Sequence, residues 1–170
     1  MDTSTVKVTP GFAATWPAKH GDIPNAYVKA DKENDLEILL HVSSGMDIND
    51  ELQKKLGATN ANKVALDLKK SLYGLKQAGR LWNQLLHASL SDAGFTQCIS
   101  DICLYFKRNE KDLTAAGVYV NISLVTATGA AAVERGFISI ALLSNKNLGS
   151  VSKFLGTRVM ARDVHTYAPD

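Results

Sequence analysis

The stretch GVYVNISLVT, Gly117 to Thr126, has the pattern of a β-hairpin. Two short β-prone runs, residues 118–120 and 123–126, flank Asn121-Ile122, and extended runs about two residues apart favour a tight turn. Asn suits such a turn because it tolerates a positive φ. Ile does not, because its branched Cβ makes a positive φ costly. One explanation for Ile at this tip is that the turn was once selected for chemistry and has since lost its chemical residues.

The composition is that of a folded protein. A chain of 170 residues with 45% hydrophobic content predicts one domain or two small ones with an ordinary core. A net charge of +2 is too small to imply nucleic-acid binding from total charge alone. Cys98 and Cys103 form no CxxC pair and the four histidines show no ligand spacing, so no zinc site is predicted.

The sequence also bears on location. No apolar run approaches the roughly 20 residues that span a bilayer, and the N-terminus lacks the basic and apolar regions of a secretory signal. We therefore expect an intracellular protein, cytoplasmic or nuclear, with reduced thiols and no membrane partner.

Residues 78–93 give the clearest helix, because apolar side chains recur at i, i+3 and i+4 and Gly94 follows as a C′ residue. A second helix, weakened by Gly136, is expected over 130–143, and residues 47–62 favour a short helix or a loop. Strands are expected over 36–42, 103–108, 113–126 and 153–159. This mixture predicts an α+β fold, with helices covering one face of a sheet.

Two features point toward binding chemistry. Asp22 follows a glycine at the end of a short extended run and is a candidate ligand for a divalent cation, although a solvated or helix-capping Asp is the simpler interpretation. Residues 63–80 hold five basic side chains and one acid, Asp67. The simple interpretation is a solvated basic face; the alternative is a phosphate-contacting surface that includes Lys69, Lys70 and Arg80.

Four ordered blocks resemble the copia-type LTR-retrotransposon reverse transcriptases. SLYGLKQAGRLW, starting at Ser71, is similar to the family's LYGLKQAPRxW motif, and GDIPNAYVKAD, starting at Gly21, resembles its first catalytic motif. SDICLYFKR from Ser100 and NLGSVSKFLGTRV from Asn147 resemble the DPCLY and DLG…FLG segments. GVYVNISLVT stands where the family has VYVDD. The resemblance covers about residues 5 to 160 and implies a palm-like antiparallel sheet.

The resemblance also implies a mechanism and its residues. Reverse transcriptases use two Mg²⁺ ions held by carboxylates, one from the first motif and two from YVDD. Asp22 matches the first, and Asn121 and Ile122 stand at the other two positions. Tyr27 matches the aromatic residue that packs under the nucleotide sugar. Lys76 and Gln77 match the segment that lies against the incoming nucleotide and the template.

The departures from the family pattern predict an inactive site. Three formal negative charges fall to one, because Asn121 offers only a neutral amide and Ile122 offers no ligand. We therefore expect no stably bound Mg²⁺ and at most weak binding of an RNA or DNA template-primer. Residues 1–170 are expected to form a single partial domain, a palm with little of the fingers or thumb and no RNase H or integrase part.

Three other hypotheses remain open. One is a retained polymerase with substitute ligands, Asp31 or Asp101. Another is a non-catalytic module that binds nucleic acid or a protein partner, whose identity the sequence does not give. The last is a translated pseudogene product with no selected role.

Overall fold

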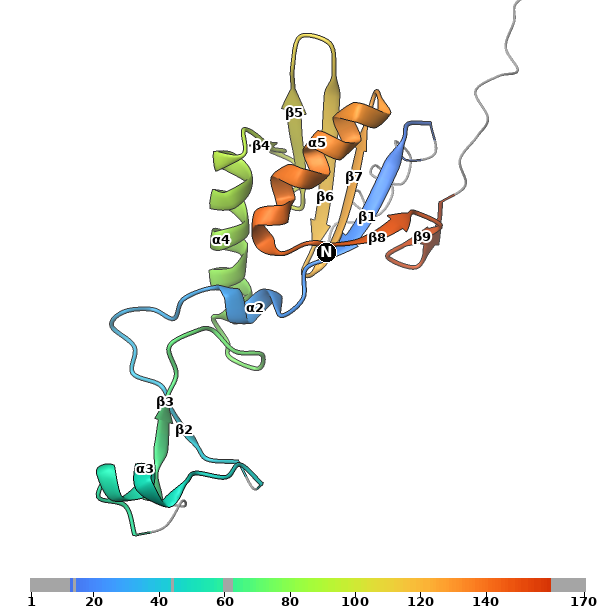
Figure 1. Ribbon diagram of the computed structural model, residues 1–170. Coiled ribbons are helices and arrows are strands. Elements are labelled where there is room, and N and C mark those ends of the chain that lie inside the picture. Colours follow the sequence, from blue (N-terminus) through green and yellow to red (C-terminus); the bar gives the residue numbers. More distant parts are fainter. Residues whose placement is uncertain (1–12, 14, 44, 60–62, 160–170) are drawn as a thin grey trace, which may run out of the picture. The chain divides into compact units, whose positions relative to one another are not determined.

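The structure, a computed structural model, describes residues 13, 15–43, 45–59 and 63–159. The chain divides into two compact units. Figure 1 labels the helices and strands and colours them by their position in the sequence. Unit 1 comprises the residues up to Ala26 and those from Trp82 onward, and unit 2 comprises Tyr27–Leu81. A single partial domain over residues 1–170 stays a prediction.

The described part of unit 1 is built on a six-stranded sheet with the order β4-β5-β6-β7-β1-β8, in which all neighbours are antiparallel. The first strand in the described ranges, β1, lies between β7 and β8 and so joins a sheet made mostly from later sequence. The strand bounds are β1 Ala18–Asp22, β4 Thr96–Gln97, β5 Leu104–Arg108, β6 Leu113–Tyr119, β7 Ile122–Ala127 and β8 Lys146–Ser150.

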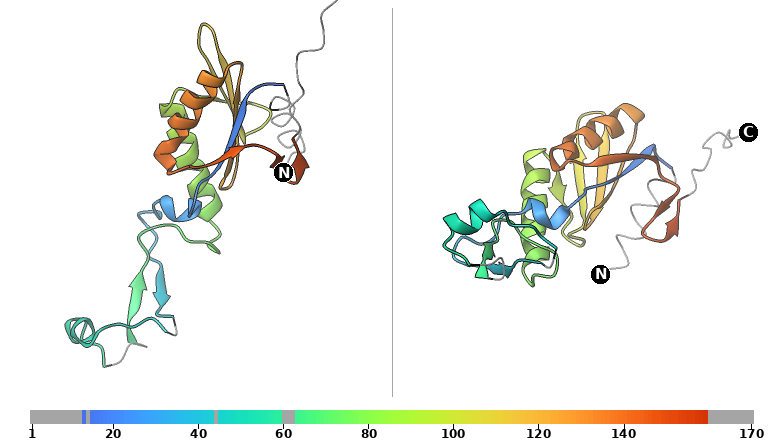
Figure 2. Two further views of the ribbon diagram at one scale, coloured as in Figure 1. Left: turned by 45° about the vertical axis from the view of Figure 1, so that its right-hand side comes forward. Right: turned by 60° about the horizontal axis from the view of Figure 1, so that its bottom comes forward.

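Two helices, α4 (Ala78–Asp92) and α5 (Ala130–Ile140), lie on the same side of this sheet (Figure 2). A short 3₁₀ turn, η2 (Ala141–Leu143), continues α5. The predicted helices over 78–93 and 130–143 are thus confirmed, as is the α+β class. Gly94 ends α4 as predicted: its φ is +83°, and the Phe95 amide donates to the Leu90 carbonyl at 2.9 Å.

Gly136 lets α5 approach the sheet closely. A Cβ at this position would lie 2.8 Å from Thr114 Cγ2 and 3.1 Å from Val125 Cγ1, and both of those side chains stand on the helix-covered face. Tyr105 on β5 belongs to the same face, and its ring lies 6.1 Å from that of His87 on α4. Gly136 lowers the helix propensity of this segment, but its lack of a side chain allows α5 to pack closely on the sheet.

The β6–β7 hairpin exists where the sequence predicts it, but its turn is displaced by one residue. Tyr119 pairs with Ile122, so the two turn residues are Val120 and Asn121, and Ile122 is the first residue of β7. The prediction that Ile122 stands at the tip was wrong, because the register is fixed by pairing across the hairpin rather than by residue type. The β-branched residue at the tip is Val120.

The predicted strand over 153–159 is instead a small hairpin of β9 (Lys153–Phe154) and β10 (Thr157–Arg158). Leu155 and Gly156, with φ of +47° and +83°, make the turn between them. Strand β8 was not predicted from the sequence; its residues are mostly exposed, and it pairs with β1 across a register shift. A polar edge strand has no alternating apolar pattern to reveal it.

The sheet face opposite the helices carries a separate apolar cluster of buried side chains: Ala13, Leu124, Phe154 and Val159. Half-buried Ile122 packs against this cluster. Asp22 shares this face with Ile122, because the two residues are opposite each other in the β1–β7 ladder.

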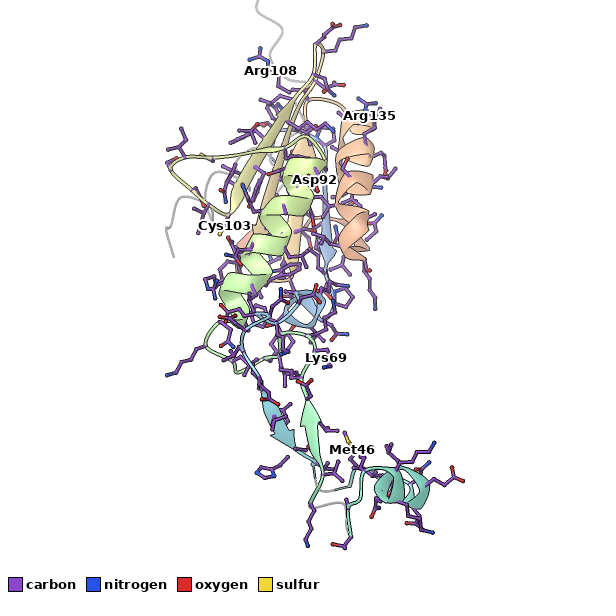
Figure 3. All side chains as sticks on the ribbon, turned by 90° about the vertical axis from the view of Figure 1, so that its left-hand side faces the viewer. Met46, Lys69, Asp92, Cys103, Arg108 and Arg135 are labelled. Carbon is purple, nitrogen blue, oxygen red and sulfur yellow. The ribbon has the colours of Figure 1, made fainter. Side chains whose placement is uncertain are left out.

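Unit 2 has little buried apolar surface among its described residues. Its two-stranded ladder, β2 (Leu39–His41) with β3 (Ala65–Asp67), is shorter than the strand predicted over 36–42. Helix α3 (Asp50–Lys55) is capped by Asn49 and buries no residue, and α2 (Ala26–Lys29) begins at the unit boundary. Figure 3 labels Met46 and Lys69 in this unit; its exposed large apolar side chains are Leu36, Leu39, Met46, Leu52, Leu56 and Tyr73.

No helix in the described ranges is both long and apolar enough to cross a bilayer.

Replacing Gly136 with Ala is expected to lower the free energy of unfolding by about 1–3 kcal/mol, because the new methyl group would overlap Thr114 and Val125. The matched control is Gly79→Ala in α4, where no atom lies within 4 Å of the new Cβ and the higher helix propensity of Ala is expected to be neutral or stabilising. Urea unfolding, monitored by tryptophan fluorescence, measures the free energy of unfolding of both variants. A stabilised Gly136→Ala variant would contradict the close helix–sheet packing.

Candidate functional site at the end of β1

The last residue of β1 meets the β6–β7 turn. Asp22 pairs with Ile122 in the ladder, and the Ile23 amide, one residue on, donates to the Asn121 carbonyl at 2.6 Å. The indole Nε1 of Trp82 donates to the carbonyl of Val120 at 2.8 Å. Both carbonyls of the two-residue turn are therefore held, one by the residue after β1 and one by α4.

The turn has a strained backbone. Val120 has a φ of +53°, in the left-handed region that a β-branched residue rarely adopts. Such a conformation costs on the order of 1–2 kcal/mol and persists when neighbouring contacts hold it. The hydrogen bonds to Trp82 and Ile23 supply those contacts.

Asp22 and Asn121 are in direct contact. The Nδ2 of Asn121 donates to Oδ1 of Asp22 at 2.6 Å, and both residues are half-buried. An ionised carboxylate only accepts, so the amide nitrogen rather than the amide oxygen must face it. Ile122 presents hydrocarbon on the same face. The structure thus brings the three predicted residues together, with one carboxylate among them.

This corner does not fit a pair of divalent cations. Magnesium binds carboxylate and other oxygen ligands, and here one of the two Asp22 oxygens already accepts a bond from an amide nitrogen. Across the residues that the structure describes, no three His, Cys, Asp or Glu side chains gather in a way that would hold a metal ion. The arrangement has one acceptor group and a neutral donor, which suits a hydrogen-bonded joint.

The predicted nucleotide-binding residues belong to unit 2. The Tyr27 ring lies against that of Tyr73, with centroids 4.6 Å apart and planes at 48°. Lys76 is exposed and Gln77 is half-buried just before α4, where the Gln77 carbonyl accepts from the Leu81 amide at 3.0 Å. Their roles toward a nucleotide stay predictions.

The basic side chains predicted to contact nucleic acid have acidic partners in unit 2. Lys69 pairs with Asp67, Lys70 pairs with Asp31 at 2.5 Å, and Arg80 pairs with Glu33. The Lys69 ammonium, chiefly through its hydrogen bond, lowers the pKa of the Asp67 carboxyl. Residues 27–81 carry nine Lys or Arg and eight Asp or Glu, a net charge of +1. The basic character of residues 63–80 is therefore offset by acids outside that stretch.

The substitute ligands considered from the sequence have other partners. Asp31 contacts Lys70, as above, and Asp101 is buried with its Oδ1 accepting from the Cys103 amide at 3.0 Å. Asp101 thus caps the turn before β5 with its side chain. The adjoining thiols are free and half-buried; burial raises the pKa of Cys103, which stands just before β5 (Figure 3), whereas the Ser100 hydroxyl lowers that of Cys98.

Two residues of the site were missed in the sequence analysis. Trp82 lies in the helix predicted over 78–93 and was not singled out, although a buried indole usually needs an acceptor for its N–H, and this requirement was the available clue. Gly21 was seen only as the residue before Asp22. A Cβ there would lie 2.7 Å from the Lys146 carbonyl and 2.8 Å from Phe137 Cζ, so glycine lets β8 and α5 pack against β1.

Residues 2–167 match the family model described as reverse transcriptase (RNA-dependent DNA polymerase). The chain belongs to the reverse transcriptase family. Similar proteins include the Retrovirus-related Pol polyproteins from transposon TNT 1-94 of Nicotiana tabacum, 28% identical over 82% of this chain, and from transposon RE1 of Arabidopsis thaliana, 27% identical over 74%. A Saccharomyces cerevisiae protein named for transposon Ty5-1 is 36% identical over 52% of the chain.

These relatives confirm a copia-type reverse-transcriptase domain of retrotransposon Pol origin. The aligned parts cover 29% of the Ty5-1 protein, 10% of the TNT 1-94 polyprotein and 8% of the RE1 polyprotein. No solved structure matches the chain.

Replacing Val120 with Gly is expected to raise the free energy of unfolding by up to about 1 kcal/mol, because glycine adopts the positive φ without strain. Val118→Gly is the matched control. Val118 is buried within β6, so its loss is expected to cost at least about 2 kcal/mol. Denaturant titration of both variants measures the difference. A Val120→Gly variant as unstable as Val118→Gly would show that the turn carries no strain.

Proposed function

We propose that this chain is a reverse-transcriptase palm that no longer polymerises DNA. The family reaction is nucleotidyl transfer supported by two divalent cations, which stabilise the attacking and leaving oxygens. Asp22, Asn121 and Ile122 occupy the positions of the three carboxylates by resemblance, and one of the three is acidic. The contact between the Asn121 amide and the Asp22 carboxylate carries the proposal, because it engages the surviving carboxylate in a hydrogen bond within the chain.

The arrangement of strands is consistent with the proposed palm. Asp22 and Ile122 share the sheet face opposite α4 and α5, and α4 supports the site from the other side through the Trp82 hydrogen bond to the turn. Trp82 and Ile23 hold the turn against the end of β1. These contacts support the proposal that the chain keeps the scaffold of a palm while two of the three expected carboxylates are absent.

The alternative is a non-catalytic module that binds nucleic acid or a protein. Three cations proposed for nucleic-acid contact, Lys69, Lys70 and Arg80, are each paired with a carboxylate, which reduces the positive charge available to phosphates. Exposed apolar side chains of unit 2 agree better with a protein partner than with a template-primer. Any template-primer binding is therefore expected to be weak.

Primer extension with purified chain tests the loss of activity. We expect that an RNA template annealed to a DNA primer, supplied with nucleotides and either Mg²⁺ or Mn²⁺, gives no more extension with this chain than with its Asp22→Ala variant. The reason is that one carboxylate does not organise two cations.

An active reverse transcriptase in the same buffer shows that the template-primer is usable. Extension by the unmodified chain clearly above the Asp22→Ala level would contradict the proposed function.

A further inference from the structure

The corner between β1 and the β6–β7 turn contains a hydrogen bond that two carboxylates would not make. The Asn121 Nδ2 and the Asp22 Oδ1 lie 2.6 Å apart. A carboxylate at position 121 in the same pose would bring two acceptor oxygens to that separation, which requires a proton or a cation between them. An amide at 121 closes the same corner with neither.

The residue at position 122 contributes in a second way. Ile122 stands directly opposite Asp22 and packs on the apolar cluster of Ala13, Leu124, Phe154 and Val159. A charged side chain there would have to stay solvated beside that cluster. Ile122 instead extends the apolar cluster to the edge of the Asp22 site.

The backbone around the joint is also fixed. Ile23 donates to the Asn121 carbonyl at 2.6 Å and Trp82 donates to the Val120 carbonyl at 2.8 Å. These bonds fix the backbone at Asn121, so only its side chain has to be ordered when the amide–carboxylate contact forms. The amide–carboxylate contact therefore loses little conformational entropy on forming, and a charged acceptor strengthens it.

We propose that Asp22 is now a structural residue, the acceptor of a metal-independent joint that Asn121 and Ile122 complete. This inference goes beyond the loss of polymerase activity, because it gives Asp22 a role in holding β1 to the hairpin. It also gives a reason for an aspartate at position 22, where the surrounding residues no longer form a metal site. The joint needs one acceptor and one donor, so exchanging the two residues should preserve it.

The test is a residue swap read by unfolding rather than by activity. Both tryptophans, Trp16 and Trp82, belong to unit 1, so tryptophan fluorescence during urea unfolding of the full chain reports on the unit that contains the joint. All measurements are made in EDTA and repeated in Mn²⁺. The unmodified chain is expected to unfold at the same urea concentration in both.

Asn121→Asp is expected to lower the midpoint in EDTA, because it places two carboxylates at the joint. The reciprocal double variant Asp22→Asn with Asn121→Asp restores one amide and one carboxylate, and we expect it to recover at least half of the lost midpoint. The control is Asp22→Ala with Asn121→Asp, which removes the repulsion without restoring a hydrogen bond and is expected to recover less than the swap.

Three results would overturn the proposal. They are an Asn121→Asp variant as stable as the unmodified chain in EDTA, a swap no more stable than the Asp22→Ala control, and a midpoint of the unmodified chain that rises in Mn²⁺. Because Asp22→Asn is isosteric, the swap stays interpretable even if the alanine variant fails to fold. Polymerase activity enters none of these readouts, so failure here is distinguishable from failure of the proposed function.

Discussion

The hydrogen bond from the Asn121 amide to the Asp22 carboxylate sets the character of the whole site. Carboxylate oxygens accept and do not donate, so a corner made of carboxylates closes only around protons or cations. Replacing one of them with an amide allows direct closure at 2.6 Å. The antiparallel pairing of β1 with β7 makes this contact possible, because it brings residues 99 positions apart in the sequence to the same end of the sheet.

The rest of unit 1 holds that corner in place. Gly21 lets β8 and α5 pack against β1, and Gly136 lets α5 lie close to β6 and β7. From α4, Trp82 reaches the carbonyl of Val120 and fixes a turn whose backbone is strained. These contacts hold the end of β1 and the β6–β7 turn together without help from a second acidic side chain, so the fold of this site does not depend on the chemistry proposed for its ancestors.

Sequence patterns predicted the local elements better than the pairing between them. The periodicity of residues 78–93 and Gly94 located α4, and the β-prone runs located the β6–β7 hairpin. The turn was predicted one residue too late, because register depends on cross-strand partners. The same limit applies to the basic residues, since Lys70 and Arg80 find Asp31 and Glu33 from distant sequence. The ordered motifs singled out Asp22, Asn121 and Ile122, but the hydrogen bond between the first two and the role of Trp82 became apparent only from the three-dimensional structure.

Equilibrium binding of Mn²⁺ tests most directly whether one carboxylate is too few to hold a pair of divalent cations. Binding is measured as the loss of the free-ion signal in electron paramagnetic resonance. The prediction is that titration curves of the unmodified chain and of Asp22→Ala superimpose, because the Asp22 corner lacks the oxygen ligands that hard cations need. Two Mn²⁺ ions bound per unmodified chain, and lost on replacing Asp22 with Ala, would contradict the account.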